Sequence, residues 1–173
     1  MLAVATVWAC ASSGSPTPTI NPDVRIVTPQ NEQAMSISST VVEGVATVAA
    51  PIDKVWAVLT PSYDSLGIPL TAIDPASHSV ANGGVIVHRR LGKTRLSEYL
   101  NCGNSQGGPS ADTYEINLSI TTRLAPASPS GTTVTTVVNA AGKPASLSGD
   151  YIPCASTDGL ETRLVRMIEA QLK

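Results

Sequence analysis

The chain has 173 residues, of which 42% are apolar, 3% aromatic and 14% charged, with no phenylalanine. Its formal net charge of −2 gives no basic field for phosphates, which argues against a nucleic-acid-binding protein. The apolar fraction is ordinary for one globular domain, and the few aromatic residues leave the core to valine, isoleucine, leucine and alanine.

The first feature in chain order is a short apolar leader that ends at Cys10. The segment Val7-Trp8-Ala9-Cys10 resembles a bacterial lipobox, although Trp8 stands where a small or polar residue is usual. No lysine or arginine precedes Arg25, whereas a signal peptide has a basic n-region. We therefore interpret residues 1–9 as a signal-peptide remnant whose start lies upstream, and Cys10 as the lipid attachment site. A signal peptide cleaved nearby, or an apolar strand, is the alternative.

A tether is predicted to follow over residues 10–33. It is rich in serine, threonine and proline, and it lacks a sustained apolar period. The globular domain is expected over residues 34–173. It opens with a long β-branched segment, residues 36–49, which predicts one strand with a kink or bulge at Gly44.

A helix is predicted next, because the apolar period changes. Pro51 suits a first helical turn, and Pro61 and Gly67 are expected to bring the helix to an end. Its apolar face has the spacing i, i+3, i+4 and i+7 and consists of Ile52, Val55, Trp56 and Leu59.

A meander of strands is predicted over residues 68–141. Two or three strands are expected over 68–100, with a turn or bulge at 82–84, and a glycine-rich loop over 101–110. Residues 113–124 alternate strictly between apolar and polar side chains, as in an antiparallel sheet with one buried face. A hairpin connection and a partner strand over 132–141 follow, and residues 142–157 are expected to form a second loop.

The chain is predicted to end in an amphipathic helix. Asp158 and Glu161 have the spacing of a capping box. The expected inner stripe is Leu160, Leu164, Met167, Ile168 and Leu172, and the expected outer residues are Glu161, Arg163, Arg166 and Glu169. The predicted fold class is therefore α+β: an antiparallel curved sheet of about six strands, with one helix after the first strand and a long C-terminal helix packed on the sheet.

The order of elements resembles the helix-grip superfamily, which includes START, polyketide-cyclase and pollen-allergen-type domains. The resemblance is carried by residues 44–59, where a strand ends at a small-residue–proline step and the helix bears a Val55-Trp56 pair. It implies a cavity between sheet and terminal helix that takes an apolar small molecule, with Trp56, Leu164 and Ile168 as candidate pocket residues. A lipid-anchored member also resembles, in broad plan, the C subunit of the outer-membrane β-barrel assembly machinery.

The two remaining cysteines, Cys102 and Cys154, are predicted to form a disulfide, because an exported protein reaches an oxidising compartment. Two buried free thiols are the alternative. No metal site is predicted, since the cysteines lack adjacent histidines and C-x-x-C spacing.

No catalytic constellation is predicted. Residues 103–107 match G-x-S-x-G, but Gly108-Pro109 follows instead of a helix, and the only histidines, His78 and His88, precede the serine. We therefore expect a non-catalytic cell-envelope lipoprotein, without cofactor, on the periplasmic face of a bacterial membrane. It would bind a partner protein or an apolar small ligand, but no nucleic acid. The alternatives are a cyclase-like or hydrolase-like enzyme that uses His88 or Glu98 as base, and a purely structural envelope component.

Overall fold

The computed structural model describes residues 43–145 and 149–173. Cys10, the tether over 10–33 and residues 36–42 of the first predicted strand lie outside the described residues. None of the helices in the described ranges is long and apolar enough to cross a membrane.

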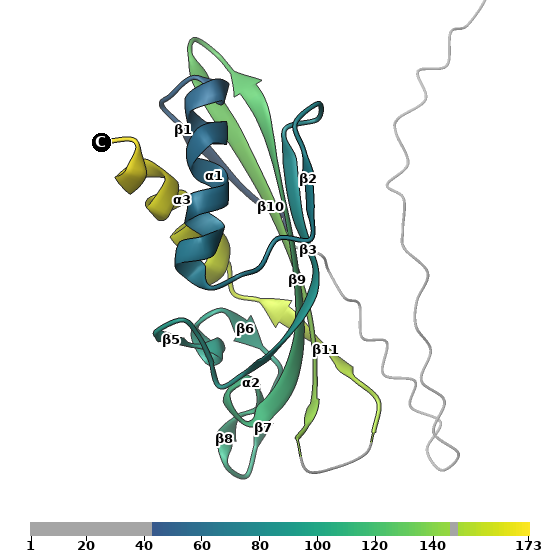
Figure 1. Cartoon of the computed structure of the whole chain (residues 1–173). Helices are drawn as coiled ribbons and strands as arrows, with labels where there is room; N and C mark the ends of the chain where they lie inside the picture. Colours follow the sequence, from purple (N-terminus) through teal and green to yellow (C-terminus); the bar gives the residue numbers. More distant parts are fainter. Residues whose placement is uncertain (1–42, 146–148) are drawn as a thin grey trace, which may run out of the picture. The chain divides into compact units, whose positions relative to one another are not determined.

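The fold is α+β, as predicted, with a large antiparallel sheet, a helix after the first strand and a C-terminal helix (Figure 1). The sheet consists of β1 (Glu43–Val48), β2 (Ala72–Asp74), β3 (Ser79–His88), β6 (Leu100–Asn101), β9 (Tyr114–Ala127), β10 (Gly131–Pro144) and β11 (Ile152–Ser156). Two short hairpins are made by β4 (Arg90–Leu91) with β5 (Thr94–Arg95) and by β7 (Asn104–Ser105) with β8 (Gly108–Pro109). The helices are α1 (Ile52–Leu66), the 3₁₀ turn η1 (Leu96–Glu98), α2 (Ser110–Thr113) and α3 (Gly159–Gln171).

The sheet order is β2-β3-β9-β10-β11-β6, and β1 also pairs with β10. β1 lies opposite residues 132–137 of β10, whereas β11 lies opposite residues 140–142. These two strands therefore share one edge of β10, end to end. The predicted irregularity at 82–84 is a bulge in β3, where the register shifts between Asn82 and Val85.

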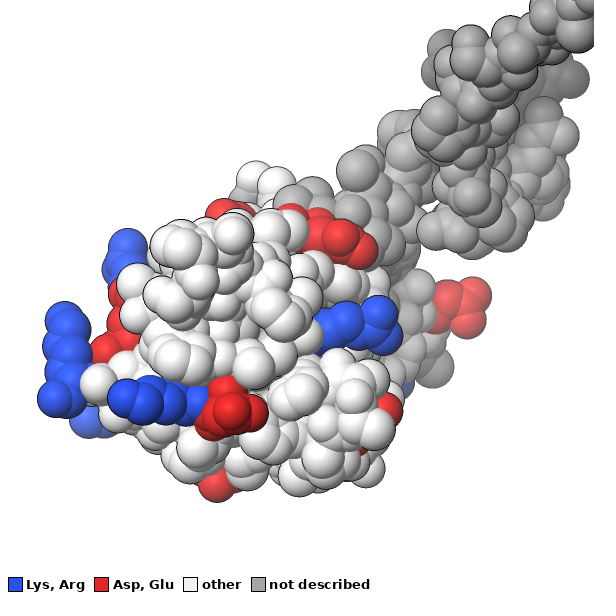
Figure 2. Space-filling view, turned by 90° about the horizontal axis from the view of Figure 1, so that it is seen from above, with Lys and Arg blue, Asp and Glu red and all other residues white. Residues whose placement is uncertain are grey.

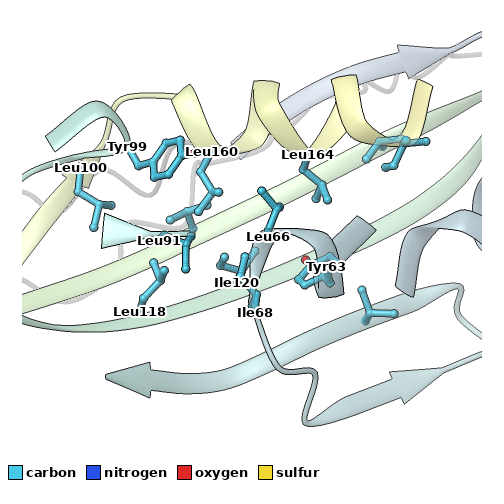
Figure 3. Close-up of a cluster of buried hydrophobic side chains, with 14 of the residues drawn as sticks. Tyr63, Leu66, Ile68, Leu91, Tyr99, Leu100, Leu118, Ile120, Leu160 and Leu164 are labelled. Carbon is cyan, nitrogen blue, oxygen red and sulfur yellow. The ribbon is translucent and has the colours of Figure 1, made fainter. Parts of the chain in front are cut away.

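The core lies between the sheet and the two long helices. The strict alternation in β9 buries Ile116, Leu118, Ile120 and Leu124, each at most 3% exposed. Figure 3 shows Leu160 and Leu164 pointing from α3 toward the region where Leu66 and Ile120 lie. The apolar face of the sheet thus packs against the apolar faces of the helices. Because the alternation of apolar and polar residues marks these faces in the sequence, it favours a two-layer arrangement.

Pro61 does not end α1, contrary to the sequence prediction. The helix continues to Leu66, and Gly67 ends it in the left-handed conformation at φ 73°, with its N–H donating to the Asp64 carbonyl. Proline in a helix costs one backbone hydrogen bond. Burial of Tyr63 and Leu66 beyond Pro61 offsets that cost, since both side chains are at most 4% exposed.

Two local predictions between the long strands and the helices were also wrong. Within residues 68–100, where only strands were expected, η1 separates β5 from β6, and the expected loop over 142–157 contains β11. β11 is held by pairing with β10 on one side and β6 on the other. Such long-range pairing overrides a local composition that includes Pro153 and Cys154.

The start of α3 differs from the predicted capping box. Asp158 adopts the left-handed conformation at φ 63°, and its side chain makes no capping hydrogen bond. Glu161, expected on the outer face, is 3% exposed and accepts a hydrogen bond from Ser156 Oγ at 2.7 Å. A positive φ at the cap turns the Asp158 side chain away from the geometry that a capping box requires.

Candidate functional site

A hollow of about 340 Å³ lies along one side of α3, and we call it the α3–η1 hollow. Its walls come from β5, η1 and the residue after it, and from one face of α3. The lining residues are Thr94, Glu98, Tyr99, Gly159, Arg163, Arg166, Met167 and Ala170. Its volume falls in the range typical of small-molecule sites.

The segment around η1 is held against the start of α3 by hydrogen bonds from Thr157. The Thr157 N–H donates to the Tyr99 carbonyl at 2.9 Å, and Thr157 Oγ1 donates to the Glu98 carbonyl at 2.8 Å. Gly159 permits this approach, because a Cβ there would collide with the Glu98 carbonyl oxygen. The wall that carries Tyr99 is therefore fixed to the segment before α3 by hydrogen bonds from the Thr157 main chain and side chain.

A disulfide between Cys102 and Cys154 ties the same wall to the sheet. β6 pairs with β11 so that Asn101 faces Ala155 and Leu100 faces Ser156. Extending that antiparallel register by one position places Cys102 opposite Cys154, and their Cα atoms are 4.3 Å apart. The bond thus joins directly opposed residues of neighbouring chain segments, three residues after Tyr99 in the chain.

The α3–η1 hollow combines an apolar wall with two cations, Arg163 and Arg166, and one carboxylate, that of Glu98. Tyr99 is 3% exposed, and its hydroxyl has no hydrogen-bond partner among the described residues. Met167 and Ala170 continue the apolar wall, whereas Arg163 and Arg166 are exposed. Within residues 43–145 and 149–173, neither guanidinium has a carboxylate within 4 Å. Both remain available for an acidic group.

The three pocket residues suggested by the family resemblance lie elsewhere. Leu164 and Ile168 are 2% and 0% exposed and lie together in the packed core. Trp56 is half-buried against the same core, with its ring edge-on to His78 at 5.5 Å between centroids. None of the three lines the α3–η1 hollow.

The residues considered for catalysis are also dispersed. His88 and Glu98 are both solvent-exposed, and only Glu98 borders the α3–η1 hollow. The G-x-S-x-G segment forms the β7–β8 hairpin, in which Ser105 Oγ donates to the Gly108 carbonyl at 3.2 Å. This serine is not at a strand-to-helix turn, which a nucleophile elbow requires.

Charged groups do not gather into a metal site in the part of the chain that the structure describes, where no three His, Cys, Asp or Glu residues are placed to hold an ion. Figure 2 shows the molecule from above, turned by 90° from the view of Figure 1. This face is mostly uncharged, with lysine, arginine, aspartate and glutamate scattered over it. That face therefore offers no continuous patch of one sign to a highly charged partner.

Sequence reasoning missed the α3–η1 hollow, although one signal for it was present. Arg163, Arg166, Met167 and Ala170 follow the spacing i, i+3, i+4 and i+7 and so share one helix face. Tyr99 reaches that face only through the β6–β11 pairing, which no local pattern predicts.

No protein-family model matches the sequence, and no curated protein matches it either. The helix-grip and lipoprotein resemblances therefore remain predictions.

Proposed function

We propose that this chain is a non-catalytic, exported, lipid-anchored domain of a bacterial cell envelope, and that it binds a small ligand in the α3–η1 hollow. The ligand would have an apolar body and one acidic group. The observation that carries the proposal is the hollow itself, where an apolar wall stands beside two arginines without carboxylate partners. An arginine binds a carboxylate bidentately, which orients a ligand as well as holding it.

Two features support export. The Cys102–Cys154 disulfide is the kind of bond that persists in oxidising compartments and is rare in the cytosol. The lipobox-like segment before Cys10, followed by a serine-, threonine- and proline-rich stretch, is typical of a domain held at a membrane by a tether. A lipid at Cys10 would place the hollow near a source of amphipathic ligands.

The enzymatic alternative needs a base that faces a bound substrate. Of its two candidates, His88 lies outside the α3–η1 hollow, and Glu98 borders the hollow but is exposed to solvent. The structural alternative needs a hollow closed by its own side chains, whereas the volume here is about 340 Å³. Binding is therefore the function that the geometry favours.

The binding test uses decanoate, a medium-chain carboxylate, and isothermal titration calorimetry on the full chain. Arg163→Gln should weaken decanoate binding about tenfold, because a charge-assisted hydrogen bond is lost. Lys54→Gln, which removes one exposed positive charge from α1, should leave the affinity unchanged. Arg163 lines the α3–η1 hollow, so the variant changes this site directly.

The proposal fails if the wild-type chain does not bind decanoate, or if Arg163→Gln binds it as tightly as wild type. Equal binding of decanol and decanoate would remove the acidic group from the proposed ligand.

A further inference from the structure

β1 has one edge that no strand covers. It pairs with β10 along its other edge, from Glu43 opposite Val137 to Val48 opposite Thr132, and it pairs with no further strand among the described residues. An edge strand presents a row of main-chain N–H and C=O groups that can pair with another chain. Proteins blunt such edges with charged side chains, proline or bulges, and β1 has only Glu43 at its first position.

The hydrogen bonds around β11 show which residues of β10 face the edge that it shares with β1. In an antiparallel pair, successive residues direct their main-chain groups alternately toward and away from the partner. The Thr157 N–H donates to the Tyr99 carbonyl, so Cys154, three residues earlier, faces β10 and its partner there, Ala140. The register of β10 with β9 is continuous. Every second residue of β10, counted from Ala140, therefore faces this edge.

The same alternation identifies the free main-chain groups of β1. Val134 and Thr136 of β10 belong to the set that faces the shared edge, and their partners in β1 are Ala46 and Gly44. Val45 lies between these two partners. It therefore directs both its N–H and its C=O away from β10, toward the uncovered edge.

A hollow of about 140 Å³ lies between β1 and α3, and we call it the α3–β1 hollow. Residues 44–46 form one wall, and Thr162, Val165 and Arg166 belong to the α3 wall. Gly44 lies on the face of β1 that packs on α3, and it is only partly buried. The Val45 side chain lies on the opposite face of the sheet and is 62% exposed. Val45 therefore offers its main chain, rather than its side chain, to a ligand at this edge.

A strand added to the uncovered edge would lie across the α3–β1 hollow. Its residue opposite Val45 would exchange two main-chain hydrogen bonds with Val45 and would share its outward face. The neighbours of that residue would point inward, toward Thr162 and Val165, because side chains alternate along a strand. The hollow is therefore placed to take inward side chains of an added strand.

A second copy of β1 would not fill the hollow. When Val45 pairs with Val45 of a copy, the inward neighbours are Gly44 and Ala46, which offer no side chain and one methyl group. The next inward residue, Val48, is 2% exposed in its own core. The occupant therefore needs larger apolar side chains than β1 has.

The charges near the edge favour an occupant with a basic C-terminal end. Glu43 is exposed, and Asp158 is exposed beside Gly44, with Oδ1 3.1 Å from the position that a Cβ there would take. Neither carboxylate has a lysine or arginine within 4 Å in the described part of the chain. An antiparallel strand places its C-terminal residues beside Glu43, where a lysine would form a cross-strand ion pair.

We propose that the edge of β1 and the α3–β1 hollow bind an extended peptide of a partner protein, which adds to the sheet as an antiparallel strand. The peptide directs apolar side chains toward α3 and carries lysine toward its C-terminal end. In strand addition, main-chain hydrogen bonds provide affinity and pockets for alternate side chains provide specificity. The site is separate from the α3–η1 hollow, because Arg163 and Tyr99 do not line it.

The test measures binding of the peptide acetyl-Ser-Thr-Leu-Thr-Leu-Lys-Lys-amide to the full chain by isothermal titration calorimetry. Its central threonine is designed to pair with Val45, so that both leucines point inward. Val45→Pro should weaken binding at least about tenfold, because it removes the outward N–H. That N–H makes no bond to β10. Val45→Thr keeps the N–H and the β-branched shape and should bind like wild type.

Two further peptides separate the contributions to binding. The reversed sequence, acetyl-Lys-Lys-Leu-Thr-Leu-Thr-Ser-amide, moves the lysines away from Glu43 in an antiparallel pairing and should bind about threefold more weakly. Replacing both leucines with serine leaves the hollow without apolar side chains and should weaken binding at least about tenfold. Arg163→Gln should bind the first peptide like wild type, so this outcome is independent of the decanoate experiment.

Amide hydrogen exchange of the wild-type chain decides should Val45→Pro fail to fold. Saturating peptide should slow exchange at Val45 and Thr47, whose N–H groups face the edge, and change it little at Gly44 and Ala46. The proposal is overturned if the first peptide does not bind, if the reversed or serine peptide matches it, if Val45→Pro binds like wild type, or if exchange at Val45 is unchanged. Protection of Val45 before peptide is added also overturns it, because a second copy or another segment of the chain then occupies the edge.

Discussion

At the residue scale, a buried chain of three hydroxyl groups crosses the core from α1 to the sheet. Tyr63 Oη lies 2.6 Å from Thr122 Oγ1, which lies 3.0 Å from Thr136 Oγ1 on β10. All three residues are at most 1% exposed. Burial raises the pKa of Tyr63 to about 12, because the charged form is costly away from water, and the hydrogen bond to Thr122 lowers it only in part.

This shift predicts how stability depends on alkaline pH. Unfolded tyrosine loses its proton near pH 10 and folded Tyr63 near pH 12, so the folded state binds more protons between these values. The free energy of unfolding is therefore unaffected by Tyr63 below pH 10 and falls as the pH rises toward 12. Because the pKa of Tyr63 differs by about two between the folded and unfolded states, the free energy of unfolding falls by about 3 kcal/mol in total.

Tyr63→Phe should remove this fall and cost about 1 kcal/mol at neutral pH, since one hydrogen bond is lost. Urea denaturation from pH 8 to 12 measures both effects as the difference from wild type. Tyr114→Phe, which leaves the network intact, is the matched control. An identical pH dependence in wild type and Tyr63→Phe would contradict the assignment.

At the element scale, the disulfide and the β6–β11 pairing act on the same junction. Cys102 follows β6, and Cys154 lies within β11, which leads through Thr157 into α3. Without the bond, the β6–β11 ladder rests on the paired positions Asn101–Ala155 and Leu100–Ser156. The position of the Tyr99 wall relative to α3 therefore depends on a covalent link as well as on hydrogen bonds.

Replacing both cysteines with serine should lower the free energy of unfolding by about 4 kcal/mol, because the link closes a loop of 52 residues in the unfolded chain. Urea unfolding of the Cys102→Ser/Cys154→Ser double variant measures the change. Cys10→Ser, which leaves the disulfide intact, serves as the control. A loss below about 1 kcal/mol would mean that the bond contributes little beyond the existing packing.

At the scale of the whole molecule, the central prediction is that the chain is held at a membrane by Cys10. The reason is chemical: a thioether-linked diacylglycerol and an acyl chain supply the two hydrophobic signals that stable anchoring requires. Cells that express the full-length protein from its natural start should incorporate labelled palmitate into it, and Cys10→Ser should abolish the label. Absence of label in the wild type would refute the anchor while leaving both hollows of α3 untouched.

The sequence by itself determined the α+β class, the long antiparallel strands and the two amphipathic helices. Periodicity is a local property: the alternation in 113–124 and the helical spacing from Ile52 to Leu59 and from Leu160 to Ile168 each identify one buried face. The pairing of Cys102 with Cys154 followed from redox chemistry and cysteine count rather than from geometry.

Only the tertiary structure decided where the sites lie. Glu161 belongs to the polar face of α3 by pattern, yet Gly44 of a distant strand buries it. Tyr99 lies beside Arg163 and Met167 because β11 pairs with β6. The candidate pocket residues Leu164 and Ile168 are instead buried in the packed core. Each outcome depends on contacts between segments far apart in the chain, whose free energy exceeds the local preferences that a linear pattern records.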